Sequence, residues 1–352
     1  MNSRGFTTFD GKAAETKGNS ASYVIPTGSD VSKMKFANIS FVGHSYEKMA
    51  SVAQKLAKRG TESDISIFDK REGDVAMSIA IPNTYPERMQ PLLQSLNLSD
   101  ASVLFADSVD GTLGELIVSL STFGVPGVVV ADSGISDKVF SLVKTRLSSW
   151  STMEYDDECE KKLREYILGL DVKREPESEF WRVDVDHSFE VKGVGTVALG
   201  IVTRGTVRVH DRIFGRPGSV EGAVRSIQIF DVDHHEAEAG SRVGLALKGM
   251  TSSQVPRGTV LTNNMRFQAA KSVSISFKRE SFYRDALESG KVIHLNAGLQ
   301  CIQSRIIDAG ERLDLEFDQD VAFEEERAVV FNARPPGQLR IAGHGMMSRL
   351  LA

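Results

Sequence analysis

The stretch from Val224 to Met250, VRSIQIFDVDHHEAEAGSRVGLALKGM, decides the fold of the C-terminal half of the chain. Apolar and polar residues alternate at its two ends, in VRSIQI and RVGLALK, as they do in half-buried strands. The polar loop between these ends closes at Gly240, a residue type common in turns. The stretch therefore predicts antiparallel strands joined by turns.

The same texture extends from Phe180 to the C-terminus. Short Val-rich runs such as GTVALGIVTRG and VRVHDRIFG are separated by Gly and Asp at intervals of about 8 to 12 residues, which is typical of a barrel or sandwich. A second all-β segment begins at about Phe267. We predict one β-barrel over residues 179–266 and another over residues 267–352.

Upstream, residues 35–175 alternate between short apolar runs and amphipathic segments. FANISFVG predicts a strand, EKMASVAQKLAKRG a helix, and DISIFDKREGDVAMSIAIP two strands around a turn at Lys70–Gly73. Strands separated by helices predict an α/β domain with a mostly parallel sheet covered on both faces. Residues 1–34 contain few hydrophobic residues, and we expect a flexible tail.

The order of these units resembles that of translational GTPases. The sequence of the first barrel is the most specific part of this resemblance. The strands VRSIQI and AGSRVGLALKG, followed by VPRGTVL, are similar to the second domain of elongation factors. The last segment, ending PGQLRIAGHG, resembles the third domain of selenocysteine-specific factors and of the related initiation-factor γ subunit. The resemblance covers about residues 36–346 and implies a role in translation.

The resemblance also implies a phosphate-binding loop in FVGHSYEKMAS, where the family has GxxxxGK[ST]. Gly43 and His44 match the family, but its second Gly becomes Lys48, its Lys becomes Met49 and its Ser or Thr becomes Ala50. The loop therefore lacks the groups that neutralise phosphate and hold Mg²⁺. A shift of one residue recruits Lys48 as the cation but restores neither the Gly nor the hydroxyl.

The other nucleotide motifs of the family are also altered. Residues 81–84 read Ile-Pro-Asn-Thr where the family has Asp-x-Pro-Gly, and the guanine-reading segment becomes Ala-Asp-Ser-Gly, with Asp132 out of place. The first effector segment is replaced by the short hairpin around residues 70–73. We therefore expect a pseudo-GTPase with no cofactor and no catalytic residue.

The alternative is an active GTPase with an unorthodox loop. In that case GTP and Mg²⁺ would be bound at Gly43, His44 and Lys48. A further alternative is a protein-interaction module that regulates a true elongation factor by competing for its partners.

The resemblance implies RNA contacts on the first barrel, whose counterpart receives the aminoacylated 3′ end of tRNA. Phe230 would stack on the terminal adenine, while Arg242, Lys248 and Arg257 would meet phosphates or the acyl group. The alternative places Phe230 in the barrel core and the basic residues at ordinary turns. The expected partners are tRNA or another RNA, the ribosome or a translation factor.

The composition of the chain bears on three classes of protein: membrane proteins, secreted proteins and proteins that bind nucleic acid through their overall charge. Hydrophobic residues make up 41% of the 352-residue chain, yet no apolar run is long enough to span a bilayer, and the net charge of −5 gives no general attraction to nucleic acid. The start of the chain lacks the apolar core of a secretory signal, and two cysteines cannot form a disulfide framework. We expect a cytoplasmic protein that binds neither DNA nor membranes.

Two further patterns predict no chemistry. The loop Asp231–Glu238 gathers His and carboxylates, but strand alternation aims neighbouring side chains apart, so we expect a solvated loop and no metal. His210, His294 and His344 have no visible nucleophile or acid partner in the sequence, so we predict no catalytic triad.

Overall fold

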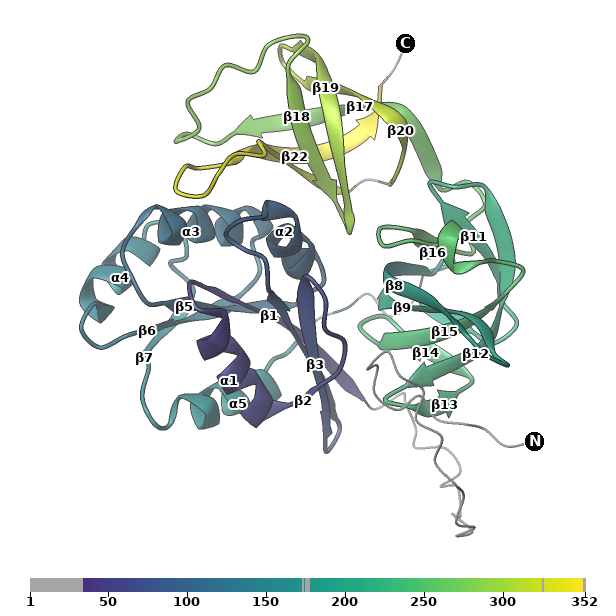
Figure 1. Cartoon of the computed structure of the whole chain (residues 1–352), viewed down its shortest axis with the longest axis horizontal. Helices are drawn as coiled ribbons and strands as arrows, with labels where there is room; N and C mark the ends of the chain where they lie inside the picture. The colour runs from purple at the N-terminus through teal and green to yellow at the C-terminus, as the bar shows by residue number, and fades with distance from the viewer. Residues whose placement is uncertain (1–33, 173, 175–177, 325, 351–352) are drawn as a thin grey trace.

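The computed structural model describes residues 34–172, 174, 178–324 and 326–350. An α/β domain is followed by a first barrel, made of β8 to β16, and a second barrel, made of β17 to β22 (Figure 1). The predicted fold class is confirmed. The predicted tail, residues 1–34, lies outside the described residues except for Met34, which is buried against the core of the first barrel.

The α/β domain is built on a sheet of order β2-β3-β4-β1-β5-β6-β7. The pairs from β4 to β7 are parallel, whereas β2, β3 and β4 pair antiparallel. Its strands are β1 (Lys35–Gly43), β2 (Lys58–Arg59), β3 (Ile65–Glu72), β4 (Val75–Pro82), β5 (Ala101–Ala106), β6 (Gly127–Ala131) and β7 (Ser151–Glu154).

Helices cover both faces of this sheet, as the alternation of strands and helices predicts. One face packs on α1 (Tyr46–Leu56) and α5 (Cys159–Leu168). The other packs on α2 (Met89–Asn97), α3 (Gly111–Phe123) and α4 (Ser136–Val143). Pro91 is tolerated in α2 because it lies in the first turn, where a backbone N–H has no partner inside the helix.

The turn between β3 and β4 lies later than predicted. Lys70, Arg71 and Glu72 belong to β3, and the chain reverses at Gly73 and Asp74. Gly73 has a φ of +62°, a conformation that glycine adopts without steric cost and that hairpin turns require. The prediction was wrong because charged residues were taken for turn residues, although they lie on the exposed end of a strand.

The strands of the first barrel follow the order β11-β16-β8-β9-β15-β12. The barrel closes because β11, at one end of this order, pairs with its neighbour β16 and also with β12 at the other end. Its strands are β8 (Arg182–Val191), β9 (Gly195–Arg204), β10 (Thr206–Arg208), β11 (Arg212–Arg216), β12 (Val220–Ile229), β13 (Val232–His234), β14 (Glu236–Glu238), β15 (Arg242–Lys248) and β16 (Val260–Thr262), with a short 3₁₀ helix, η2 (Ser252–Gln254). Its apolar alternate positions form one buried cluster.

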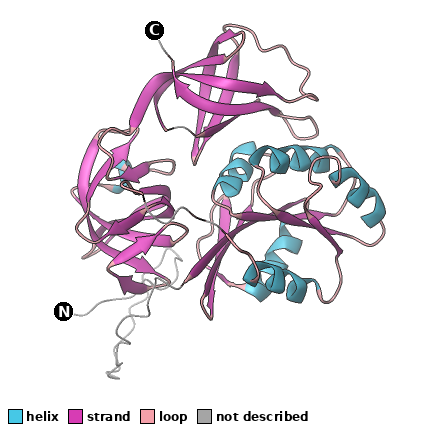
Figure 2. Cartoon of the chain, turned by 180° about the vertical axis from the view of Figure 1, so that it is seen from behind, coloured by secondary structure: helices cyan, strands magenta, loops and turns pink. Residues whose placement is uncertain are grey.

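The second barrel is closed in the order β17-β20-β19-β18-β21-β22. Its strands are β17 (Gln268–Arg279), β18 (Val292–Ala297), β19 (Gln300–Ala309), β20 (Leu313–Phe323), β21 (Arg327–Phe331) and β22 (Ile341–Arg349). Figure 2 shows that the long helices belong to the α/β domain and that both barrels are formed by strands. No helix in the described ranges combines the length and the apolar character needed to cross a membrane.

The three units pack against one another through buried side chains. Val329, Phe331 and Ile341 of the second barrel join the apolar cluster of α2 and α3. Leu98, Ile201 and Leu299, one from each unit, form a small cluster of their own. Figure 1 shows the resulting arrangement, in which each unit faces the other two.

Candidate functional site

The loop that resembles a phosphate-binding loop joins β1 to α1. Ser45 caps the helix by accepting a hydrogen bond from the backbone N–H of Lys48 at 3.2 Å. Gly43 lies so close to β5 that a Cβ at this position would be 2.5 Å from the carbonyl oxygen of Phe105. The loop therefore keeps the strand, the tight turn and the helix start of a phosphate site, even though its side chains differ.

Lys48 is held by acidic side chains that follow the next parallel strands. Its Nζ lies 2.7 Å from Asp107 Oδ1, after β5, and donates a second hydrogen bond to Asp132 Oδ1, after β6. It also lies 4.1 Å from the centre of the Tyr155 ring, after β7. Burial by itself lowers the pKa of Lys48, but the two carboxylates outweigh it and raise the pKa. The lysine is thus a fixed cation with its charge already balanced.

His44 is likewise engaged within the protein. Its Nε2 lies 3.0 Å from Asp110 Oδ1 and 3.1 Å from Ser108 Oγ. Burial by itself raises the pKa of Asp110, but hydrogen bonds from His44, the Leu113 N–H and Ser108 outweigh it and lower the pKa to about 2. A bound phosphate would therefore face an ionised carboxylate at neutral pH.

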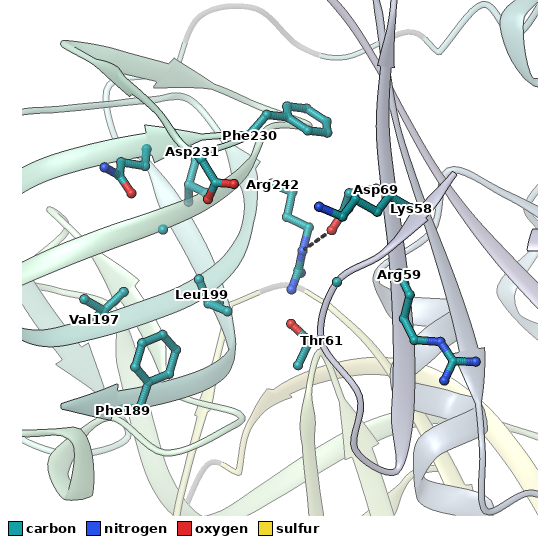
Figure 3. Close-up of a pocket in the computed structure, with 14 residues that line it drawn as sticks. Lys58, Arg59, Thr61, Asp69, Phe189, Val197, Leu199, Phe230, Asp231 and Arg242 are labelled. Carbon is teal, nitrogen blue, oxygen red and sulfur yellow. Dashed lines mark ion pairs between the residues drawn. The ribbon is translucent and has the colours of Figure 1, made fainter. Parts of the chain in front are cut away.

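A second candidate site lies between the first barrel and the β2–β3 edge of the α/β domain. This interdomain pocket has a volume of about 330 Å³, within the usual range for small-ligand sites. Figure 3 shows side chains from both units around it. The lining residues are Lys58, Arg59, Gly60, Thr61 and Asp69 of the α/β domain and Phe189, Val197, Leu199, Gln228, Phe230, Asp231, Arg242, Val243 and Gly244 of the barrel.

Arg242 reaches from the barrel across this pocket (Figure 3). Its guanidinium donates to both oxygens of Asp186, a fully buried carboxylate, and its Nε lies 3.8 Å from Asp69 Oδ2. Burial opposes the ionisation of Asp186, but Arg242 and His187 outweigh it and hold its pKa far below the ordinary range. At Asp69 burial prevails over the attraction of Arg242 and raises the pKa.

Phe230 lies at the edge of the same pocket, in a backbone conformation with a φ of +51° that non-glycine residues rarely adopt. Its side chain is partly buried against the barrel core. The structure therefore brings Phe230 and Arg242 together, as the predicted RNA contacts require, and gives Phe230 one face toward the barrel core and one toward the pocket.

The other predicted RNA contacts lie elsewhere. Arg257 lies at the interface of the barrel and the α/β domain, where its Nη1 is 2.7 Å from Asp64 Oδ1. Lys248 is exposed and lines a separate cavity of about 540 Å³ with Arg225 and His210. Arg257 lines a third cavity, of about 410 Å³, with Gln94 and Leu299, so neither Arg257 nor Lys248 lines the interdomain pocket.

Sequence reasoning missed a group beside Arg257. His187 Nδ1 lies 2.6 Å from Asp186 Oδ1, and its Nε2 lies 3.1 Å from Ser63 Oγ, in the loop between β2 and β3. The strand β8 shifts register between Val185 and His187, and such bulges re-aim neighbouring side chains. The adjacent Asp-His pair was the available signal in the sequence, but its third member lies 124 residues away.

The loop Asp231–Glu238 folds into β13 and β14 and the short connections around them. Within the described part of the chain, no three or more His, Cys, Asp or Glu side chains are grouped as metal ligands. The loop instead pairs with β12 and β10 through its backbone.

Comparisons with known proteins agree with this architecture. Residues 195–262 match the family model described as Elongation factor Tu domain 2. The uncharacterized protein MJ0325 of Methanocaldococcus jannaschii is 32% identical over 295 residues, which cover 83% of this chain and 93% of that protein. The selenocysteine-specific elongation factor of the same organism is 26% identical over 313 residues, which cover 78% of this chain and 66% of that factor.

Solved structures give the same result for the fold. The translation elongation factor SelB from Methanococcus maripaludis, solved in complex with the GTP analogue GPPNHP, superposes with a TM-score of 0.79. The match covers 91% of this chain and 80% of that structure, at 21% sequence identity. The described units therefore follow the architecture of that factor, and the chain spans about two thirds of the length of the curated selenocysteine-specific relative.

Proposed function

The chain belongs to the family of MJ0325 and is a paralogue of the archaeal-type SelB- and EF-Tu-like translation elongation factors, and on this premise we propose that it binds the aminoacylated 3′ end of tRNA without using a nucleotide. The binding site in this proposal is the interdomain pocket. The α/β domain serves as a scaffold that forms one wall of the pocket.

The contacts of Lys48 carry the nucleotide-independent part of the proposal. For Lys48 to bind phosphate, it would have to leave Asp107 and Asp132, both of which would then face the incoming anion. Two unit charges 4 Å apart interact by about 4 kcal/mol near a protein surface. The dipole of the helix N-terminus offers only about 1 kcal/mol, whereas micromolar binding needs about 8 kcal/mol.

The composition of the interdomain pocket supports the RNA part. Phe230 lines the pocket together with an apolar wall formed by Val197 and Leu199, while the guanidinium of Arg242 is held by both oxygens of Asp186. Bases of single-stranded RNA ends stack on aromatic rings, and free basic side chains donate hydrogen bonds to phosphate oxygens. Lys58 and Arg59 add positive charge from the α/β side.

Filter binding tests the proposal with charged and uncharged tRNA, at several salt concentrations, with GTP, GDP or neither. We expect salt-sensitive binding of charged tRNA with the same Kd in all three nucleotide conditions. Phe230→Ala should weaken binding by about 5- to 150-fold, the loss of about 1–3 kcal/mol for one stacked base. The matched control is Leu142→Ala, which changes an exposed apolar residue on α4, outside the pocket lining.

The result that contradicts the proposal is the absence of salt-sensitive binding of either tRNA. A Kd that falls tenfold or more on addition of GTP and Mg²⁺ would contradict its nucleotide-independent part alone, because the occupied Lys48 gives GTP no ready cation.

A further inference from the structure

Three side chains from two units converge beside the interdomain pocket. Ser63 is exposed in the loop between β2 and β3, and its Oγ lies 3.1 Å from Nε2 of His187 on β8. The other ring nitrogen of His187 lies 2.6 Å from Oδ1 of Asp186, whose side chain is 3% exposed. Hydroxyl, imidazole and buried carboxylate thus form a continuous hydrogen-bonded series in the order of a nucleophile, a base and the group that orients the base.

The hydrogen bond to Asp186 sets the tautomer of His187. A carboxylate accepts but does not donate, so Nδ1 carries the proton and the lone pair of Nε2 faces Ser63. This orientation is fixed, because Arg242 holds Asp186 from the other side through both of its carboxylate oxygens. His187 can therefore take a proton from Ser63 but cannot rotate without breaking a buried pair.

Arg257 supplies a cation at the same place. Its Nη2 lies 3.2 Å from Ser63 Oγ and 3.2 Å from His187 Nε2, and its Nε donates to the backbone carbonyl of Asp186 at 2.9 Å. Since Nε2 has one lone pair, Ser63 and Arg257 compete to donate to it. A carbonyl oxygen bound beside Ser63 would accept from Nη2 instead and leave Nε2 to the serine.

Ser63 Oγ also lies within hydrogen-bond distance of the next two residues. The backbone carbonyl oxygen of Ile65 is 3.3 Å away. The same Oγ lies 3.1 Å from Asp64 Oδ1, a carboxylate already paired with Arg257 Nη1 at 2.7 Å. The hydroxyl is therefore surrounded by acceptors and has a cation beside it. This is the environment in which a serine loses its proton as it attacks an electrophile.

Two residues that line the interdomain pocket connect it to Ser63, His187 and Asp186. Thr61, two residues before Ser63 in the same loop, lines the interdomain pocket, and so does Arg242, the partner of Asp186. On the proposed function, that pocket holds the end of a charged tRNA, whose amino acid is attached as a carboxylic ester. The ester would then lie at the edge of the pocket lined by Thr61 and Arg242, which adjoin Ser63 along the chain and Asp186 in space respectively.

We propose that Ser63, His187 and Asp186 hydrolyse aminoacyl esters, with Ser63 as nucleophile, His187 as general base and acid, and Asp186 as the residue that positions His187. Ser63 Oγ forms a bond to the ester carbonyl carbon and its proton passes to His187 Nε2, while Arg257 faces the oxyanion. The ester C–O bond then breaks and the ribose oxygen takes that proton. Water, deprotonated by His187, releases the amino acid and regenerates Ser63.

The substrate in this inference rests on the proposed function, whereas the reactive serine does not. One experiment measures both on the same purified full chain. A fluorophosphonate probe reports a reactive serine without any tRNA, and mass spectrometry locates the adduct. Bulk tRNA charged with ¹⁴C-labelled amino acids reports binding on filters and hydrolysis as the loss of acid-precipitable label.

We expect an adduct on Ser63 and a loss of label faster than in buffer. Ser63→Ala and His187→Ala should each slow the hydrolysis by about 100-fold or more, the usual contribution of a nucleophile or general base. Ser148→Ala, a change at an exposed serine before Trp150, should leave it unchanged. Ser63 is exposed, so Ser63→Ala is expected to fold, and the melting curves of all variants check this.

The outcomes separate the two proposals. Binding of charged tRNA with neither hydrolysis nor an adduct overturns the esterase inference and leaves the proposed function intact. An adduct on Ser63 without tRNA binding supports the reactive serine and overturns the tRNA proposal. Hydrolysis that continues at the full rate in Ser63→Ala overturns the role of Ser63.

Discussion

At the residue scale, the former phosphate loop is defined by what Lys48 contacts. A lysine that would be the only plausible cation for a nucleotide instead balances Asp107 and Asp132 and lies over the ring of Tyr155. Its role is then structural: it pairs with two carboxylates at the ends of adjacent strands. This interpretation makes a prediction about stability rather than about nucleotide binding.

We predict that Lys48→Met destabilises the fold by about 1–3 kcal/mol, because it removes charged hydrogen bonds and leaves the carboxylates of Asp107 and Asp132 unpaired. The measurement is the free energy of unfolding in urea. Lys55→Met on the same helix is the control: Lys55 is 59% exposed and paired with Glu160, and such surface pairs contribute little to stability. Equal effects of the two substitutions would contradict a structural role for Lys48.

Asp110 provides a prediction about pH. Its pKa is lowered to about 2, below the ordinary value of about 3.9, so the stability gained from its charge is complete above about pH 4 and is lost as the pH falls toward 2. Asp110→Asn removes the charge. The melting temperatures of wild type and variant should differ at pH 5 and converge near pH 2, and added salt should narrow the gap because the carboxylate is half exposed. A gap that persists at pH 2 would contradict this interpretation.

At the element scale, α3 is joined through a buried ion pair to Arg340, the residue immediately before the strand β22. The backbone N–H of Arg340 donates to Glu115 Oε1 at 2.8 Å, and the guanidinium donates to both carboxylate oxygens. The side chains are 1% and 4% exposed. Nη1 also reaches the carbonyl of Pro86 at 2.7 Å, so one arginine ties the second barrel to two segments of the α/β domain.

We predict that Arg340→Met costs about 3–5 kcal/mol, because it leaves Glu115 buried without a partner. The double substitution Arg340→Met with Glu115→Leu should recover much of that loss, since it removes the uncompensated charge. Urea unfolding of the single and double variants measures both. Arg312→Met, which changes a surface arginine that donates to Ser274 and Ser348, is the control and should cost little. A double variant no more stable than Arg340→Met would show that the unpaired charge of Glu115 does not cause the loss of stability.

The elements themselves were largely predictable, because alternation and helical periodicity are local properties. The exceptions are local too. The sequence pattern does not predict the strand β7, because this strand lies at the edge of the sheet, where three of its four side chains are exposed and no apolar run marks it. The β3–β4 turn was misplaced because Lys70 and Arg71, charged but extended, resemble turn residues in the sequence.

The site was predictable only in part, because its residues meet through the docking of whole units. Phe230 lies in the turn after β12 and Arg242 begins β15 of the same barrel, whose pattern is recognisable, and both residues line one pocket. Lys248 lines another cavity, since it lies at the opposite end of β15 from Arg242. Nothing in the local sequence indicates that Ser63 and His187 meet, because the α/β domain must first pack on the barrel.

At the scale of the whole molecule, the three units share buried contacts. The cluster of Leu98, Ile201 and Leu299 takes one residue from each, and Arg257 and Arg340 fasten the α/β domain to the first and second barrel respectively. In factors that change shape with nucleotide, contacts to the γ-phosphate order segments that are released on hydrolysis. On the proposed function, the engagement of Lys48 by Asp107 and Asp132 leaves no such trigger in the described part of the loop.

We predict that the radius of gyration, measured by small-angle X-ray scattering, is the same with GTP, with GDP and without nucleotide. The physical reason is that a ligand shifts a conformational equilibrium only by its differential affinity for the two states. Arg340→Met provides the comparison, because loss of the tie to the second barrel should allow that barrel to move and raise the radius of gyration. A nucleotide-dependent change in the wild type would contradict this prediction.

On the proposed function, the pairing of Lys48 also bears on how such a loop could come to bind a nucleotide. Substituting glycine at position 48 and lysine at position 49 would leave Asp107 and Asp132 without their counter-ion. Replacing those two acids first would leave Lys48 without its partners. Every single step toward a working nucleotide loop thus passes through a less stable protein. Stepwise substitution is therefore disfavoured, and a nucleotide-binding loop would require simultaneous substitutions in the loop and at the ends of β5 and β6.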